Sequence, residues 1–144
     1  MKTLAILLAL SFTITVNAQN TIPKKATKIV ICAPRQTYGQ ALLTLKRYWA
    51  QSGITITIDT AAGTYTTGVF AIPKCAGTMN LTGICHSIND TTWITTSGTY
   101  YSVPTIYGVF NYPWCYASGA IKKAFKGVNE LLLQYYPQHL LFYK

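Results

Sequence analysis

The hydrophobic pattern predicts a strand and then a helix at the start of the domain. Apolar, β-branched residues dominate 28–32, which is typical of a buried strand. After Thr37, apolar side chains recur at three-to-four spacing, as on one face of an amphipathic helix. Thr37 and Gln40 have the spacing of a capping box, and Gly53 provides a left-handed stop. The sequence therefore predicts a helix between Thr37 and Gly53.

More strands follow this helix. Residues 54–58 alternate strictly between isoleucine and threonine, as expected of a strand with one buried face. A polar turn leads from them to a second β-rich stretch at 64–72. Two longer β-rich stretches, 81–88 and 91–101, are separated by an Asn-Asp pair and predict a hairpin.

The last third of the chain combines an aromatic loop with a second amphipathic helix. Residues 102–116 contain two prolines and several aromatic side chains, so we interpret them as a loop with a short edge strand near 106–110. Ser118 can cap a helix that ends before Pro137. The resulting order is β-α-β-β-β-β-α. It predicts an α+β fold, in which an antiparallel sheet of four to five strands carries two helices packed on one face.

The N-terminal residues have the pattern of a secretory signal peptide. A positive start is followed by an apolar run and by small residues before a cleavage site after Ala18. The alternative is a membrane anchor, for which the apolar run is too short. We expect a signal peptide at 1–18, a flexible arm at 19–27 and a single domain at 28–144. The mature protein is then periplasmic or secreted, without a transmembrane segment.

Short stretches across the domain carry a resemblance to a known family. They are Lys28-Ile29-Val30-Ile31, Gly53-Ile54-Thr55-Ile56, Asp59 with Gly63-Thr64-Tyr65-Thr66-Thr67, and Ala124, Phe125, Val128 and Leu131. In these stretches the chain resembles small, largely uncharacterised exported proteins of Gram-negative bacterial envelopes. The resemblance implies a TATA-binding-protein-like or helix-grip α+β fold, and it offers no catalytic residues that could be transferred to this chain. The four cysteines and the aromatic loop depart from the family pattern.

The four cysteines favour two disulfide bonds in an exported protein, because their number is even. Cys75 and Cys85 flank a turn, so we expect them to pair, which leaves Cys32 to pair with Cys115. The alternative is a zinc site with four thiolates, but no close pair of the Cys-x2-Cys type is present. Cys85 and His86 are poor catalytic partners because neighbours on a strand point to opposite faces.

The charge balance favours an anionic partner. Twelve Lys and Arg residues oppose three Asp and Glu residues, which gives a formal net charge of +9. A basic surface attracts lipid head groups, acidic glycans or nucleic acid, and the exported address argues against intracellular nucleic acid. The carboxylates Asp59, Asp90 and Glu130 have structural roles in turns or a helix, which argues against a catalytic carboxylate pair. We expect no cofactor and no metal ion.

Two groups of side chains are candidate binding residues. The aromatic group offers rigid contact area with polar handles for a glycan or a protein, unless its members cover the sheet face away from the helices. It consists of Tyr100, Tyr101, Tyr107, Tyr112, Trp114 and Tyr116. The second group is Lys122, Lys123 and Lys126, which suit an acidic partner, unless they form an ordinary solvated helix face.

These candidates point to a non-enzymatic function. We expect an exported binding module of the cell envelope or secreted fraction that uses the aromatic loop 102–116. Its partner would be a protein, a glycan or an anionic envelope component. The alternative is a secreted inhibitor or effector that binds another protein.

Overall fold

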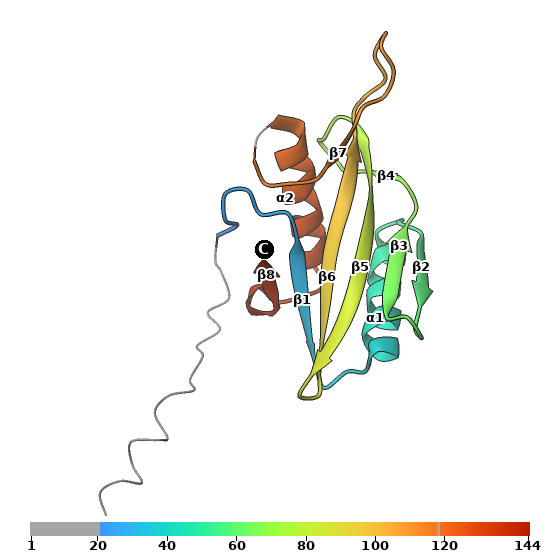
Figure 1. The fold of residues 1–144 in the computed structure, drawn as a ribbon, viewed down its shortest axis with the longest axis vertical. Coiled ribbons are helices and arrows are strands. Elements are labelled where there is room, and N and C mark those ends of the chain that lie inside the picture. Colours follow the sequence, from blue (N-terminus) through green and yellow to red (C-terminus); the bar gives the residue numbers. More distant parts are fainter. Residues whose placement is uncertain (1–20, 118) are drawn as a thin grey trace, which may run out of the picture.

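The protein is described here by a computed structural model that covers residues 21–117 and 119–144. The predicted signal peptide at 1–18 and the predicted helix cap Ser118 lie outside the described residues. Figure 1 shows the arrangement of the helices and strands along the chain. In chain order these elements are β1 (Ile29–Pro34), α1 (Tyr38–Gln51), β2 (Ile56–Asp59), β3 (Thr64–Thr67), β4 (Phe70–Ala71), β5 (Thr78–Ile88), β6 (Thr91–Tyr101), β7 (Asn111–Pro113), α2 (Gly119–Leu133), the 3-10 helix η1 (Gln138–Leu140) and β8 (Leu141–Tyr143).

One antiparallel sheet organises the fold. Its main path is β2-β3-β5-β6-β1-β8, while β4 adds to β5 and β7 adds to β6. The predicted α+β class with an antiparallel sheet and two helices is confirmed. The predicted strand count and order were wrong, because the described sheet has eight strands and a strand follows α2. The predicted strand at 64–72 is divided at Gly68, and β7 and β8 are too short to show an alternating pattern.

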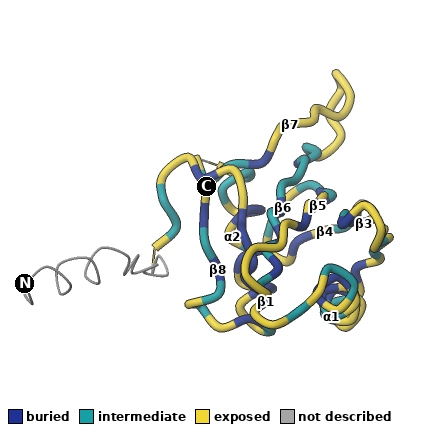
Figure 2. Tube along the Cα trace, turned by 60° about the horizontal axis from the view of Figure 1, so that its bottom comes forward, coloured by how far each residue is buried: buried dark blue, intermediate teal, exposed yellow. Residues whose placement is uncertain are grey.

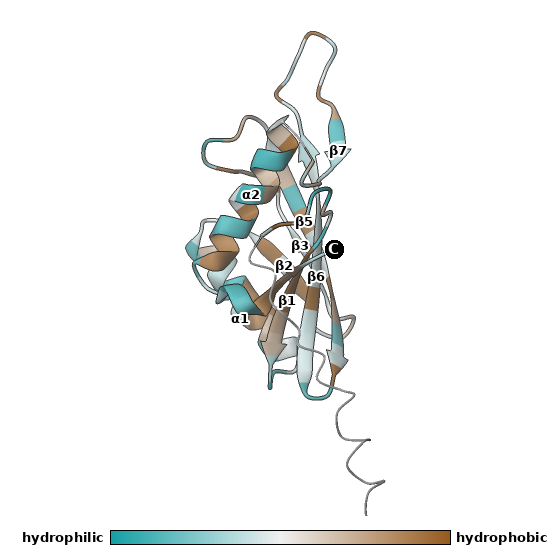
Figure 3. Cartoon of the chain, turned by 90° about the vertical axis from the view of Figure 1, so that its left-hand side faces the viewer, coloured by the Kyte–Doolittle hydropathy of each residue, from teal (hydrophilic) through white to brown (hydrophobic). Residues whose placement is uncertain are grey.

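The core lies between the sheet and the two helices, which both cover the same face (Figure 3). Side chains at alternate positions of β1, β5 and β6 point into it, and one stripe of each helix packs on them. Figure 2 shows these buried positions in dark blue. The fully buried members include Ile29, Ile31, Leu42, Leu45, Leu81, Ile94, Phe125 and Val128. Each such aliphatic or aromatic side chain contributes about 1.5–3 kcal/mol through removal from water.

Helix α1 begins and ends as the sequence predicts. The Thr37 side chain accepts a hydrogen bond from the Gln40 backbone N–H, and the Gln40 side chain accepts one from the Thr37 N–H at 3.0 Å. This reciprocal pair satisfies donors that the first helical turn leaves free. After the helix, Gly53 adopts a φ of +74°, which reverses the chain toward β2.

The N-terminal segment is attached to the rest of the fold from Lys25 onward. The Lys25 N–H donates to the Tyr116 carbonyl at 2.9 Å, and the Thr27 N–H donates to the Lys144 carbonyl at 2.6 Å. Ala26 between them is buried. These contacts extend the β1–β8 pairing and bring the segment beside the chain that leads to α2.

The two longest strands define two different ends of the molecule. Strands β5 and β6 each have eleven residues and pair along their whole length, a span of roughly 35 Å. A tight turn joins them at one end, where Asn89 and Asp90 take positive φ angles of 49° and 59°. At the other end the chain continues from β6 into residues 102–110, which rise above the sheet in Figure 1.

Replacing Gly83 should destabilise the fold. A Cβ atom at this position would overlap the ring of Tyr65, whose hydroxyl is hydrogen-bonded to Thr96 inside the core. We predict that Gly83→Ala lowers the free energy of unfolding by about 1–3 kcal/mol, measured by urea denaturation. Gly39→Ala is the control, because the added Cβ would meet Thr60 only at 3.9 Å. It should raise stability by up to about 1 kcal/mol. Equal effects of the two substitutions would contradict the close packing at Gly83.

Candidate functional site

The predicted aromatic loop is a β-hairpin that projects beyond the sheet. Strand β7 pairs with the last three residues of β6, and Tyr100 lies opposite Tyr112. Farther out, the Ser102 N–H donates to the Phe110 carbonyl at 2.8 Å, and the Phe110 N–H donates to the Ser102 hydroxyl at 3.0 Å. We call residues 99–113 the projecting hairpin. It is continuous with the core sheet.

The tip of the projecting hairpin is a tight turn at Ile106 and Tyr107. Thr105 and Gly108 exchange two backbone hydrogen bonds of 3.0 Å across it. The Thr105 hydroxyl accepts a hydrogen bond from the Tyr107 N–H at 3.2 Å. Gly108 has a φ of +103°, a conformation that glycine adopts without steric cost. Local hydrogen bonds therefore define the shape of the tip.

The tip is apolar, exposed and uncharged. Ile106 is 92% exposed and Tyr107 is 83% exposed. Figure 2 shows this part of the chain in yellow. Among the described residues, six of the eleven exposed large apolar side chains belong to the projecting hairpin. They are Val103, Ile106, Tyr107, Val109, Phe110 and Tyr112. The sequence has no charged residue from Thr91 to Ile121, so no charge in the hairpin itself offsets this apolar surface.

The structure divides the six aromatic candidates into three kinds. Tyr100 and Trp114 are buried in the core, Tyr101 and Tyr116 are half-buried, and Tyr107 and Tyr112 are exposed. Even positions in β6 point toward the helices, and this alternation takes the Tyr100 side chain inward. Its hydroxyl donates to the Ala76 carbonyl in the loop before β5. Residue type alone did not identify the aliphatic residue at the tip, Ile106, as a candidate binding residue. The long stretch without charge was the signal that could have identified it.

Trp114 anchors the base of the projecting hairpin. Its side chain is 1% exposed and packs on Phe125 of α2, with 4.6 Å between the ring centroids. Its backbone N–H donates to the Gly98 carbonyl at 3.0 Å, directly below the paired part of the hairpin. Such an aromatic pair adds about 0.5–1.5 kcal/mol to the effect of burial. Trp114 thus joins the hairpin, the sheet and α2.

Basic residues gather around the same base. The Lys122 ammonium lies 4.7 Å from the centroid of the Tyr116 ring, within the range of a cation–π contact. The backbone of Lys25 reaches the same residue, because its N–H donates to the Tyr116 carbonyl at 2.9 Å. Lys123 of α2 is close enough to Cys75 to lower the pKa of that thiol, although burial has the larger effect and raises the pKa. Lys74, by contrast, lines a hollow with Glu130 farther along α2. We call Lys25, Lys122 and Lys123 the lysine collar.

The third lysine candidate on α2 has a different environment. The Lys126 ammonium lies 3.8 Å from the Glu130 carboxylate, one helical turn further on. Both side chains are well exposed to water, so this i,i+4 ion pair adds only a few tenths of a kcal/mol to stability, about 0.3–0.5 kcal/mol in helices. It nevertheless places an opposite charge beside Lys126. The collar therefore includes the first two lysines of α2 and not the third.

The predicted disulfide bonds are not formed, because the fold separates their partners. Each of the four cysteines, Cys32, Cys75, Cys85 and Cys115, is a free thiol. Cys75 precedes β5, whereas Cys85 lies seven residues into it from Thr78, a rise of roughly 23 Å along the strand. A disulfide needs Cα atoms about 4.4–6.8 Å apart. The turn that the sequence indicated between these cysteines is in fact the start of a long strand.

The second predicted pair is separated along β6. Cys32 on β1 lies opposite Trp93, whereas Cys115 follows Trp114, which is bonded to Gly98. Five residues of extended strand separate these two positions by roughly 16 Å. Burial raises the pKa of the Cys85 thiol to about 11 and also raises the pKa of the Cys32 thiol. Cys85 and Cys32 therefore carry little thiolate at neutral pH.

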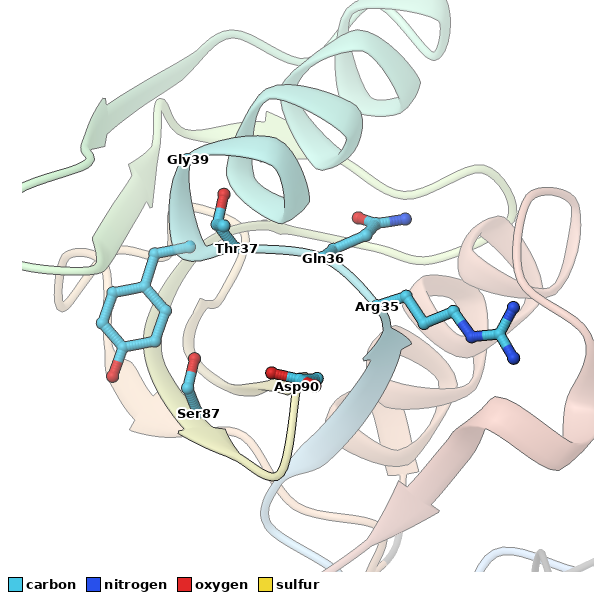
Figure 4. A pocket seen from close by; sticks show the side chains of 7 residues that line it. Arg35, Gln36, Thr37, Gly39, Ser87 and Asp90 are labelled. Atoms are coloured by element: carbon cyan, nitrogen blue, oxygen red, sulfur yellow. The ribbon is translucent and has the colours of Figure 1, made fainter.

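A second candidate site is an open hollow beside the start of α1 (Figure 4). Its cavity volume is about 720 Å³, and it is lined by Arg35, Gln36, Thr37, Tyr38, Gly39, Ser87 and Asp90. The Thr92 hydroxyl donates to the Gln36 carbonyl at 2.6 Å and lies 3.2 Å from the Ser87 hydroxyl. The Arg35 side chain extends away from Ser87 and Asp90 in Figure 4. These hydroxyl groups hold the segment before α1 against the β5–β6 turn, which is a structural role.

Two kinds of feature, a cluster of metal ligands and a membrane-spanning helix, are not found among the described residues. Within 21–117 and 119–144, no three His, Cys, Asp or Glu side chains are grouped so that they could hold a metal ion. In the same part of the chain, no helix combines the length and the apolar character that a bilayer span requires. Comparisons with protein-family models, curated proteins and solved structures find no match. The resemblance to exported envelope proteins stays a prediction from the sequence.

Substitutions at Trp114 and Tyr107 should affect the free energy of unfolding to different extents, because Trp114 is buried and Tyr107 is exposed. Trp114→Ala removes a buried ring between the hairpin and α2, and we predict a loss of about 3–5 kcal/mol in the free energy of unfolding. Tyr107→Ala removes a ring that is mostly in water and should change stability by less than about 0.5 kcal/mol. Urea denaturation measures both. A large loss at Tyr107 would contradict its exposed position at the tip.

Thiol titration checks the separation of the cysteines. We predict four reactive thiols per chain when the protein is denatured without reductant. In the native protein at about pH 8, Cys85 should react slowly with iodoacetamide, because burial raises its pKa and only the thiolate is nucleophilic. Cys115→Ser is the control and should remove one thiol from the denatured count. A count of two or none in the unsubstituted protein would show disulfide bonds and contradict this arrangement.

Proposed function

We propose that this protein is an exported, non-enzymatic binding module and that the projecting hairpin is its contact surface. The main support for this proposal is that six exposed apolar side chains lie together on residues 103–112. Isolated exposed apolar residues are ordinary on proteins, whereas a contiguous group is typical of an interaction site. This group lies at one end of the molecule, clear of the sheet and helices (Figure 3).

The shape of the hairpin also supports binding. Its base is held by Trp114 and by the pairing with β6, and its tip is held by the hydrogen bonds between Thr105 and Gly108. A contact surface that is already ordered loses less conformational entropy on binding than a flexible loop. The hairpin can therefore present Ile106 and Tyr107 to a partner without a preceding folding step.

The sequence supports the location of this function. The N-terminal signal-peptide pattern and the resemblance to envelope proteins both favour export. The excess of lysine and arginine favours an anionic component of the envelope as the partner. An inhibitor or effector that acts on another protein would use the same tip.

Co-sedimentation with an envelope fraction tests the hairpin as the contact surface. We predict that the purified protein sediments with envelopes of its source organism, and that Ile106→Asp reduces the bound fraction about tenfold, since a carboxylate opposes burial of the tip. The control is Val69→Asp, which makes the same charge change at a residue that is 62% exposed outside the hairpin.

Both variants should unfold within about 0.5 kcal/mol of the unsubstituted protein, so that a difference in sedimentation reports binding. The proposal fails if Ile106→Asp and Val69→Asp sediment equally with the envelope fraction. A protease treatment of the envelopes that abolishes binding would identify a protein partner and favour the inhibitor or effector role.

A further inference from the structure

We propose that the projecting hairpin docks on the surface of an anionic lipid bilayer. The inference rests on the proposed function, because it names the partner class of the same contact surface. Two features of the structure carry it, namely an apolar tip and a group of lysines behind it. In this arrangement the tip enters the interfacial layer, and the lysine collar meets the negatively charged head groups.

Apolar and basic groups are arranged in successive layers along the hairpin. Ile106 and Tyr107 stand farthest out, and the whole stretch from Thr91 to Ile121 carries no charge. The collar lysines come next, at the level of Tyr116 and the start of α2. In Figure 3 the tip is brown and the polar turns of α2 are teal. Interfacial membrane binding combines buried apolar area with attraction to anionic lipids in this order.

The backbone of the tip suits an apolar environment. An unsatisfied N–H or C=O group is costly in the hydrocarbon region, because no water is present to bond it. Here the N–H groups of Thr105, Tyr107 and Gly108 all donate within the tip. Tyr107 adds an aromatic ring with a polar hydroxyl, the kind of side chain that is enriched at the membrane–water interface. The tip can thus enter the interface with these three N–H groups already satisfied.

The distribution of charge orients the molecule. Of the three carboxylates, Asp90 lies in the β5–β6 turn at the end opposite the hairpin, and Asp59 lies in the β2–β3 turn. The Asp59 carboxylate accepts hydrogen bonds from the backbone of its own turn. Glu130 lies on α2, where its carboxylate is paired with the Lys126 ammonium. Lysines therefore outnumber carboxylates at the hairpin end, and an anionic surface would attract that end first.

The same lysines favour lipid over a protein groove. Lysine is depleted at protein–protein contacts relative to the rest of the surface, whereas it is common beside membrane-inserted apolar segments. Each lysine close to an anionic membrane strengthens binding by roughly fivefold. Lys25, Lys122 and Lys123 lie near one base, so their contributions act on a single docking geometry.

Flotation with protein-free lipid vesicles tests this proposal. The probes are phosphatidylcholine vesicles with and without roughly 30% phosphatidylglycerol. We expect the full protein to bind the anionic vesicles at least about tenfold more tightly than the neutral ones, and to lose most of this binding in about 0.5 M salt. Ile106→Asp should weaken binding about tenfold, while Val69→Asp should leave it unchanged.

Charge variants test the collar separately from the tip. Lys122→Gln with Lys123→Gln should weaken binding to anionic vesicles by at least about tenfold. The matched control is Lys46→Gln with Arg47→Gln, which removes the same charge from the exposed side of α1. Equal effects of the two double variants would show that net charge alone drives binding and would overturn the proposed docking geometry.

The two assays distinguish the proposals. Equal binding to neutral and anionic vesicles, or binding that Ile106→Asp leaves unchanged, overturns the membrane proposal. If the envelope fraction binds through Ile106 but purified lipids do not, the partner is a protein or a glycan. The membrane proposal then fails and the proposed function stands. If neither assay depends on Ile106, both proposals fail.

Discussion

Strand β6 changes partner along one of its edges, and the position of every functional feature depends on this change. Its first six residues pair with β1, and its last three pair with β7. Between these stretches, the Gly98 carbonyl accepts the hydrogen bond from Trp114. A Cβ atom at Gly98 would approach the Asn80 carbonyl to 2.8 Å and the Trp114 ring to 3.4 Å. Glycine therefore permits the close approach at which the chain leaves the core sheet.

This partner change links the apolar tip to the basic collar. Trp114 returns from the hairpin into the core and packs on Phe125, and Tyr116 packs on the same ring at 5.8 Å between centroids. Phe125 lies on α2, the helix that also carries Lys122 and Lys123. The tip and these lysines are consequently held by one aromatic cluster. The hairpin end behaves as one surface with an apolar outer part and a basic inner part.

The sequence predicts those helices and strands that are long enough to show a capping motif or a periodic pattern of apolar residues. The capping box of Thr37 and the strict alternation at 54–58 identified α1 and β2, because each satisfies a local physical requirement. Strands β7 and β8 have three residues each, and only their partners in β6 and β1 define them. Long-range pairing also separates Cys75 from Cys85, which local spacing alone suggested to be neighbours.

The sequence predicted which segment forms the candidate site, but not which of its residues are exposed. From residue type alone, Tyr107 and Trp114 are equally good candidates for binding, because both are large aromatic residues in one proline-containing segment. Only the pairing of β7 with β6 shows that one ring fills the core while the other stands in water. Aliphatic residues such as Ile106 were overlooked because in most segments they indicate a core. Here the absence of charge over residues 91–121 distinguishes the segment.

Site-specific photo-crosslinking would test most directly whether the hairpin tip is the surface that meets the envelope. A benzophenone side chain at position 107 reports the immediate surroundings of the tip, and the same group at position 69 serves as a control on another exposed apolar site. In the presence of envelopes, the account predicts crosslinks from position 107 to lipid and none from position 69. Crosslinks to lipid from both positions, or from position 69 alone, would contradict it.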